Sequence, residues 1–161
     1  MKIATTAGFA LALFSASICA QQVPKSGTIS IHTGWKVTGE ALEMADKVMQ
    51  GHGSAIGTSF NDKGSGPLHA GPATCFYTFY FANGVPTNKG FCTFGDADGD
   101  RFFTDWHGGP AADGNGTEGV NRIVGGTGKY AGIQGSGTWK SRDVGPHGNH
   151  LTTQRFDYRL P

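Results

Sequence analysis

Asp105 and His107 are the residues of this chain whose types and spacing best suit proton-transfer chemistry. They are two positions apart within Arg101–His107, a stretch whose aromatic residues and threonine predict a strand. Side chains two positions apart on a strand project to the same side, so a carboxyl group and an imidazole would reach one bound molecule. Tyr77, on another predicted strand, would add a phenol that orients the substrate.

A catalytic pair of this kind needs a pocket that excludes water. Phe79, Phe94 and Phe103 share the expected face of Asp105 and would form the wall of a substrate-binding lumen. Desolvation there would raise the pKa of Asp105, and the neighbouring His107 would oppose that shift. A structural interpretation stays open, in which Asp105 bonds a nearby backbone group and His107 caps a barrel mouth.

His69 is a further candidate for substrate binding, because the loop before the Cys75 strand would fold its imidazole over a barrel mouth. Nothing in the spacing selects a partner for it, so a histidine that stabilises the turn is the preferred interpretation.

The composition favours many short strands joined by turns. The chain of 161 residues contains 27 glycines and 11 phenylalanines, and only 16% of its residues are charged, which suits neither a disordered chain nor a helical bundle. Only Glu40–Val48 is rich in helix formers. Strands are predicted at Thr28–Val37, Val48–Phe60, Thr74–Phe81, Gly90–Gly95, Arg101–His107, Gly119–Val124, Gly135–Ser141 and Leu151–Leu160. Eight strands at this spacing predict an all-β fold, an antiparallel up-and-down barrel.

The N-terminus predicts export. Met1 and Lys2 precede a largely apolar stretch, Ile3–Ile18, and Ala20 offers a small residue for cleavage, which is typical of a secretory signal peptide over residues 1–20. Cys19 does not favour a lipoprotein, because the residue before it is a bulky isoleucine. Residues 21–161 would then form one secreted or periplasmic domain, without a membrane span.

Cys75 and Cys92 are the two cysteines left after cleavage, and an exported pair is normally oxidised. If they face each other across a hairpin, its midpoint lies at Ala82 to Asn83, beside a turn-rich stretch. The next hairpin is predicted to turn at Asp98-Gly99, which places Cys92 opposite Asp105.

Alternation along these hairpins sorts the side chains into two faces, both of which are too aromatic to meet water freely. One face is predicted to carry Cys75, Tyr77, Phe79, Cys92, Phe94, Phe103, Asp105 and His107. The other is predicted to carry Phe76, Tyr80, Phe91, Phe102 and Trp106. One face should line a lumen and the other should pack against something else, such as another subunit.

No cofactor or metal is expected. His147 and His150 form an H-x-x-H pair without a helix to hold it, and Asp96–Asp100 departs from a calcium loop, so we interpret it as a solvated acidic hairpin. Gly126–Ala131 only loosely matches a dinucleotide fingerprint and lacks its βαβ setting. Loss of Lys2 leaves twelve basic and twelve acidic residues, which excludes a nucleic-acid interface based on net positive charge.

The segment Ile123–Trp139 reads as a strand end, a glycine turn, a single helical turn and a new strand. Tyr130 and Ile133 lie three apart, so both would plug one end of a barrel. This segment resembles one found in dirigent proteins and in the allene-oxide-cyclase-like barrels. The resemblance implies a ligand-sized lumen, chemistry without a metal or organic cofactor, and a homo-oligomer, namely a trimer.

Two classes of function follow from these observations. The first is an exported, cofactor-free isomerase, cyclase or lyase that acts on an apolar or phenolic small molecule in the lumen. The second is an exported binding or structural barrel that holds a small apolar or aromatic ligand unchanged. The enzyme requires Asp105, His107 and Tyr77 inside the lumen. The binding protein requires an aromatic and threonine lining, with the Asp105 face turned outward or into a subunit contact.

Overall fold

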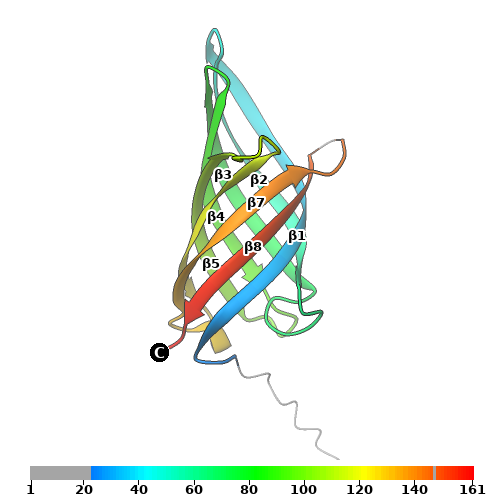
Figure 1. Ribbon diagram of the computed structural model, residues 1–161, viewed down its shortest axis with the longest axis vertical. Coiled ribbons are helices and arrows are strands. Elements are labelled where there is room, and N and C mark those ends of the chain that lie inside the picture. The colour runs from blue at the N-terminus through cyan, green and yellow to red at the C-terminus, as the bar shows by residue number, and fades with distance from the viewer. Residues whose placement is uncertain (1–22, 147) are drawn as a thin grey trace, which may run out of the picture.

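The computed structural model describes residues 23–146 and 148–161, which form a closed eight-stranded antiparallel barrel (Figure 1). The strands are β1 (Ser26–Ala45), β2 (Val48–Asn61), β3 (Gly71–Ala82), β4 (Val85–Gly95), β5 (Arg101–Pro110), β6 (Thr117–Gly126), β7 (Gln134–Asp143) and β8 (Asn149–Arg159). They follow chain order around the barrel, and β8 pairs with β1 to close it, so every strand has two neighbours. The predicted all-β, up-and-down barrel is confirmed.

The helical content of the described residues is a single 3₁₀ turn, η1 (Gly128–Tyr130), and no helix there has the length and apolar character needed to cross a membrane. The predicted signal peptide, residues 1–20, lies outside the described residues.

One end of the barrel carries a long projecting hairpin. The pairing of β1 with β8 ends at Lys36 opposite Asn149, but β1 continues beside β2 as far as Ala45 and forms the tall tip in Figure 1. The helix-forming stretch Glu40–Val48 therefore forms the end of β1 and the hairpin turn. So short a helix would be marginal by itself, whereas the strand pairs its backbone groups with β2.

The β3–β4 hairpin confirms the predicted disulfide. Cys75 and Cys92 are directly paired across the two strands and are bonded through their sulfur atoms. The turn is formed by Asn83 and Gly84, with φ angles of 52° and 83°, as a two-residue turn between twisted strands requires. The turn thus begins one position later than the predicted midpoint at Ala82 to Asn83.

The β4–β5 hairpin corrects the predicted register. The Asp96 amide donates a hydrogen bond of 2.9 Å to the carbonyl of Asp100, so the loop contains three residues, with Gly99 in the left-handed region at φ 90°. The predicted two-residue turn at Asp98-Gly99 was wrong by one residue on β5, and Cys92 faces Thr104, not Asp105.

A shift of one residue turns every side chain of a strand to its opposite face. The side chains of Phe102, Thr104 and Trp106 therefore point inward, whereas those of Phe103, Asp105 and His107 point outward. The faces predicted for β3 and β4 are correct, because the disulfide fixes the pairing of those two strands.

The end of the barrel opposite the projecting hairpin is closed by η1. Tyr130 and Ile133 are fully buried there, which confirms the predicted plug. Tyr130 packs on Phe102, whose ring meets that of Phe156 edge to face with centroids 5.0 Å apart. Phe94 contacts both Phe102 and Phe156, so this half of the lumen is filled by an aromatic core.

A buried carboxylate ties this plug to the β4–β5 loop. Asp96 accepts hydrogen bonds from the phenol of Tyr130 and from the Leu68 amide, the latter at 2.5 Å. The ammonium group of Lys129 lies 2.9 Å from Asp96 and 2.6 Å from Asp98. The Asp96–Asp100 loop, interpreted from its sequence as a solvated hairpin, therefore has one aspartate in the closed end of the barrel.

Removing the Tyr130 hydroxyl in a Tyr130→Phe variant is expected to lower the free energy of unfolding by about 2 kcal/mol, because a buried carboxylate loses a donor. Urea unfolding followed by circular dichroism measures this. Tyr80→Phe, which alters a half-exposed phenol on the outer wall, is the matched control and should change stability little. Equal losses in the two variants would contradict the structural role of the plug.

Candidate functional site

The half of the lumen near the projecting hairpin contains a cavity of about 290 Å³. All eight strands contribute to its lining, which comprises Trp35, Val37, Ala55, Cys75, Tyr77, Phe79, Asn88, Cys92, Trp106, Thr117, Asn121, Trp139, Ser141, His150, Thr152 and Gln154. Closed barrels of eight strands leave interiors that hold either side chains or one small ligand. This barrel does both, with a packed half and a hollow half.

Glycines on the wall make room for the aromatic rings that line the cavity. A Cβ on Gly90 would lie 2.9 Å from Cζ2 of Trp106, and a Cβ on Gly108 would collide with the ring of Trp139. The two indoles contact each other edge to face, with centroids 5.3 Å apart. Any larger residue at Gly90 or Gly108 would push an indole toward the barrel axis and narrow the cavity.

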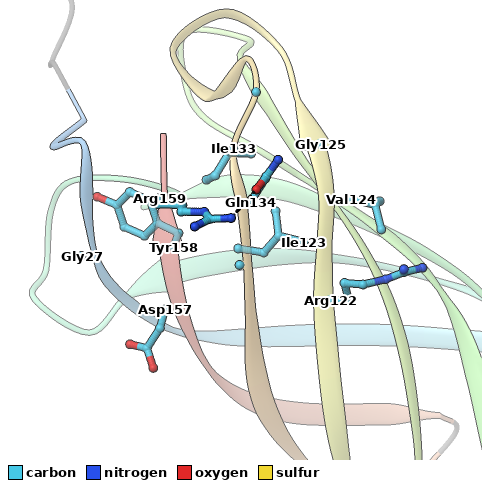
Figure 2. A pocket seen from close by; sticks show the side chains of 12 residues that line it. Gly27, Arg122, Ile123, Val124, Gly125, Ile133, Gln134, Asp157, Tyr158 and Arg159 are labelled. Atoms are coloured by element: carbon cyan, nitrogen blue, oxygen red, sulfur yellow. Dashed lines mark hydrogen bonds between the residues drawn. The ribbon is translucent and has the colours of Figure 1, made fainter. Parts of the chain in front are cut away.

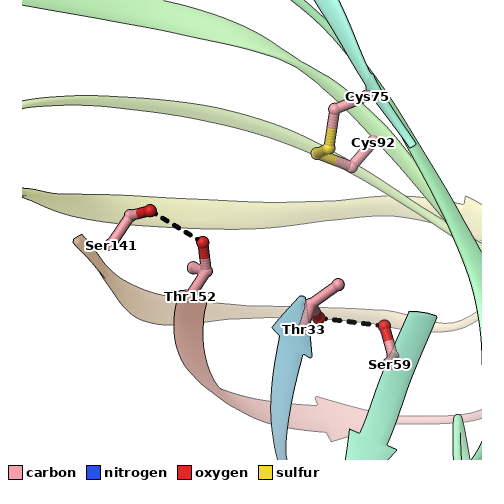
Figure 3. The surroundings of a disulfide bond; sticks show 6 residues. All are labelled: Thr33, Ser59, Cys75, Cys92, Ser141 and Thr152. Atoms are coloured by element: carbon pink, nitrogen blue, oxygen red, sulfur yellow. Dashed lines mark hydrogen bonds between the residues drawn. A yellow bond between two sulfur atoms is a disulfide. The ribbon is translucent and has the colours of Figure 1, made fainter. Parts of the chain in front are cut away.

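Two pairs of hydroxyl groups in the lumen bond each other within the wall. Figure 3 shows the hydroxyl pairs Ser141–Thr152 and Thr33–Ser59, each at 2.9 Å, and the disulfide on another part of the wall. The disulfide and the Ser141–Thr152 pair both line the cavity, on strands far apart in the sheet order. These contacts fix the wall without using the groups described next.

Five cavity-lining side chains each have a buried polar atom that lacks a hydrogen-bond partner in the described part of the protein: Trp106 Nε1, Trp139 Nε1, Asn121 Nδ2, Asn88 Oδ1 and Gln154 Oε1. A buried polar group left unpaired costs about 1–3 kcal/mol. A site with several such groups in an aromatic cavity is chemically suited to a small molecule that carries polar atoms.

The rim of the cavity carries its titratable groups. Burial raises the pKa of Tyr77, whose hydroxyl donates a hydrogen bond of 3.2 Å to the Thr38 carbonyl, so the phenol stays protonated. Nδ1 of His150 lies 3.0 Å from Oδ1 of the exposed Asp143. The described lining contains no Asp, Glu, Lys or Arg side chain.

The structure does not bring the predicted catalytic set together. Tyr77 lines the cavity, but Asp105 and His107 lie on the outer wall because of the β5 register. Asp105 accepts hydrogen bonds from Arg122, with Nε 3.0 Å from Oδ2. These hydrogen bonds hold the pKa of Asp105 below its ordinary value, opposite to the shift expected for a carboxyl group inside the lumen.

The predicted substrate-binding residues are divided among four environments. Phe79 lines the cavity, whereas Phe94 belongs to the packed core and is fully buried. Phe103 is on the outer wall. His69 lies in the β2–β3 loop at the closed end, edge to face with Phe60 at 5.9 Å, and so contributes to that loop and not to the cavity.

Three hollows of larger volume lie elsewhere and are open to solvent. One is at the closed end beside η1, where Figure 2 shows Arg122 and Asp157 on opposite sides of the hollow and Gln134 bonded to Arg159. A second lies beside the projecting hairpin, and a third lies over β6 to β8 around Glu118, Lys140 and Arg155. The cation of Arg122 is already paired with Asp105. The lumen combines an aromatic lining with buried polar atoms that lack a partner among the described residues, so it is the better candidate site.

Most of the polar lining was not predicted from the sequence, namely Trp106, Asn121, Trp139, His150 and Gln154. The sequence signal that could have revealed this lining is a glycine on one strand directly opposite an aromatic residue on the next strand. Gly90 is directly paired with Trp106, and this register becomes visible only when the β4–β5 loop is given its three residues.

No group of three His, Cys, Asp or Glu side chains that could hold a metal ion occurs among the described residues. His150 is beside Asp143, and His147, the other member of the H-x-x-H pair, lies outside the described residues.

Comparison with protein-family models and with curated proteins finds no match for this chain. The fold and the cavity alone therefore define the class of protein: a closed antiparallel β-barrel with a ligand-sized lumen that is open toward one end and plugged at the other.

The Asp105–Arg122 pair makes a pH-dependent contribution to stability. The pKa of Asp105 is lower in the folded protein than its ordinary value of 3.8, so the pair stabilises the fold above about pH 4 and this contribution disappears as the pH falls through the folded-state value. Asp105→Asn should lower stability at neutral pH and lose its effect in acid, as measured by urea unfolding across pH.

Asp46→Asn, at the tip of the projecting hairpin, is the control for the loss of one surface carboxylate. Asp105→Asn should also leave ligand binding in the lumen unchanged, because the side chain lies on the outer wall. A loss of binding in this variant would indicate that Asp105 contributes to the binding site.

Proposed function

We propose that this protein is an exported barrel that binds one small aromatic molecule in its lumen. The observation that carries the proposal is the cavity of about 290 Å³, which three tryptophans, Tyr77 and Phe79 line above a packed core. Its volume is at the lower end of the range for small-molecule pockets. Aromatic walls supply a large apolar contact area, and the orphaned polar atoms supply orientation.

The position of the predicted catalytic pair favours binding over catalysis. Asp105 and His107 are on the outer wall, as the binding interpretation requires, and the described lining lacks a carboxylate. The lining does contain amides and indoles besides aromatic rings and threonines, so the bound molecule is expected to have polar atoms as well as an apolar body.

Export is part of this proposal. The N-terminal sequence pattern predicts a signal peptide, and a disulfide persists in an oxidising compartment such as the periplasm or the extracellular space. The trimer implied by the resemblance stays an expectation. Phe76 and Phe91, paired on the outer wall and 66% and 65% exposed, offer an apolar surface for such an assembly.

Binding is testable with 2-naphthol, because all three tryptophans of the chain line the cavity and report on its occupancy. Titration should change tryptophan fluorescence with a dissociation constant in the micromolar to submillimolar range. Ala55→Phe, which fills the cavity from β2, should weaken binding at least tenfold. Ile56→Phe, the next residue and exposed on the outer wall, should leave it unchanged. Equal affinities in the two variants, or no binding at all, would contradict the proposal.

A cofactor-free isomerase, cyclase or lyase is the second candidate, favoured by one observation. His150 lies on the cavity lining with Asp143 beside its Nδ1, an arrangement that orients an imidazole for proton transfer. Tyr77, protonated and on the same lining, would donate a hydrogen bond to the substrate.

The enzyme candidate is tested by proton exchange. In deuterated buffer the protein should speed exchange of the protons next to the carbonyl of 2-tetralone, as followed by mass spectrometry. His150→Gln should reduce this rate by on the order of 10²–10⁴ and leave 2-naphthol binding intact. Exchange no faster than in buffer would remove this candidate and leave the binding function standing.

A further inference from the structure

The lumen has two chemically different walls. Strands β5 to β8 carry Trp106, Asn121, Trp139 and Gln154, each with a buried polar atom that lacks a partner in the described residues. Strands β1 to β3 carry Trp35, Ala55 and the disulfide at Cys75, which present mainly apolar surface. A molecule in this cavity would meet hydrogen-bonding groups on one side and apolar groups on the other.

The polar groups of the first wall lie next to one another in the sheet. Trp106 is directly paired with Asn121 across β5 and β6, and Trp139 is directly paired with Gln154 across β7 and β8. The two indoles are in contact, with centroids 5.3 Å apart. Two indole N–H donors and two amide groups are thus gathered in one sector of the wall, where a single polar group of a ligand has several possible partners.

The described lining has no Asp, Glu, Lys or Arg side chain to compensate an ionic ligand, and the imidazole of His150 at its rim already has Asp143 beside Nδ1. An anion or a cation would lose its hydration without a compensating charge. Aromatic rings can surround a cation, but indole N–H groups are the positive edges of their rings and donate to acceptors, so they favour an oxygen atom over a cation.

The size of the cavity sets the size of the molecule. A cavity of about 150 Å³ is sufficient for benzene, and the lumen cavity, at about 290 Å³, has close to twice that volume. This volume suits two fused rings.

We propose that the lumen selects neutral bicyclic aromatic ketones, with the carbonyl oxygen bound by the indole N–H groups of Trp106 and Trp139. This inference rests on the proposed binding function and adds the chemical class of the ligand. Asn121 supplies a further donor beside Trp106, and Gln154 accepts a hydrogen bond from a hydroxyl substituent where the ligand has one.

The test compares four two-ring probes as competitors of bound 2-naphthol on the wild-type protein: chromone, naphthalene, 2-naphthoate and N-methylquinolinium. Chromone, a neutral ketone, should displace 2-naphthol at a concentration at least tenfold lower than naphthalene, which lacks the oxygen. The anion and the cation should compete more weakly than chromone, because the described lining holds no opposite charge for either.

Two variants identify the donors. Trp139→Phe and Trp106→Phe keep an aromatic ring and remove the N–H. Each should therefore weaken the binding of chromone about tenfold and change the binding of naphthalene little. Trp35→Phe, on the apolar wall, is the matched control and should affect the two probes equally. The ratio of the affinities for chromone and naphthalene corrects for changes in cavity shape. Circular dichroism establishes that each variant is folded.

The outcomes separate the two proposals. If 2-naphthol binds but chromone and naphthalene compete equally, the ketone inference is wrong and the binding function stands. Stronger competition by 2-naphthoate or by N-methylquinolinium than by chromone would overturn the preference for neutral ligands. If 2-naphthol itself does not bind, the proposed function fails, and the inference fails with it.

Discussion

The hollow half of this barrel depends on a packing constraint between aromatic rings and glycines. A closed sheet of eight strands encloses little more space than its own side chains fill. Trp106 lies over Gly90 and Trp139 lies over Gly108, so these large rings lie along the wall and leave the axis open. The same relation holds for Tyr77 at Gly53 and for Phe79 at Gly51. The shape of the cavity therefore depends on the glycines as much as on the aromatic rings.

The two ends of the lumen differ because their inward residues differ. Toward η1 the inward positions hold Phe94, Phe102 and Phe156, which interlock and need no polar partner. The buried carboxylate of Asp96 is compensated by Tyr130 and Lys129, so the closed end is both apolar and electrostatically satisfied. Toward the projecting hairpin the inward positions hold amides and indoles that are buried without partners among the described residues. The aromatic core is thus concentrated at one end, and the cavity lined by five side chains with unpartnered polar atoms lies at the other.

This division explains why the outer wall and the lumen have different chemistry. Charged side chains of β5 and β6 pair with each other on the outside, as Asp105 does with Arg122, and the described cavity lining keeps none. A site without charges recognises its ligand by shape and by hydrogen bonds, whose directions are set by rigid strands. Such a lumen can hold a molecule unchanged, or it can orient one for proton transfer by His150 at the rim.

The sequence by itself determined the architecture: the eight strands, the Cys75–Cys92 hairpin and the plug formed by Tyr130 and Ile133 follow from turn chemistry, cysteine pairing and residue alternation. It also placed Tyr77 and Phe79 on the same face as the disulfide, and the structure shows that this face lines the lumen. Only the tertiary structure decided the face of β5, because a three-residue loop and a two-residue turn differ by one position and alternation converts that position into opposite faces. The lining contributed by β6, β7 and β8 was likewise decided by the tertiary structure. Closure of the barrel brings these strands together, and local sequence signals do not relate them to one another.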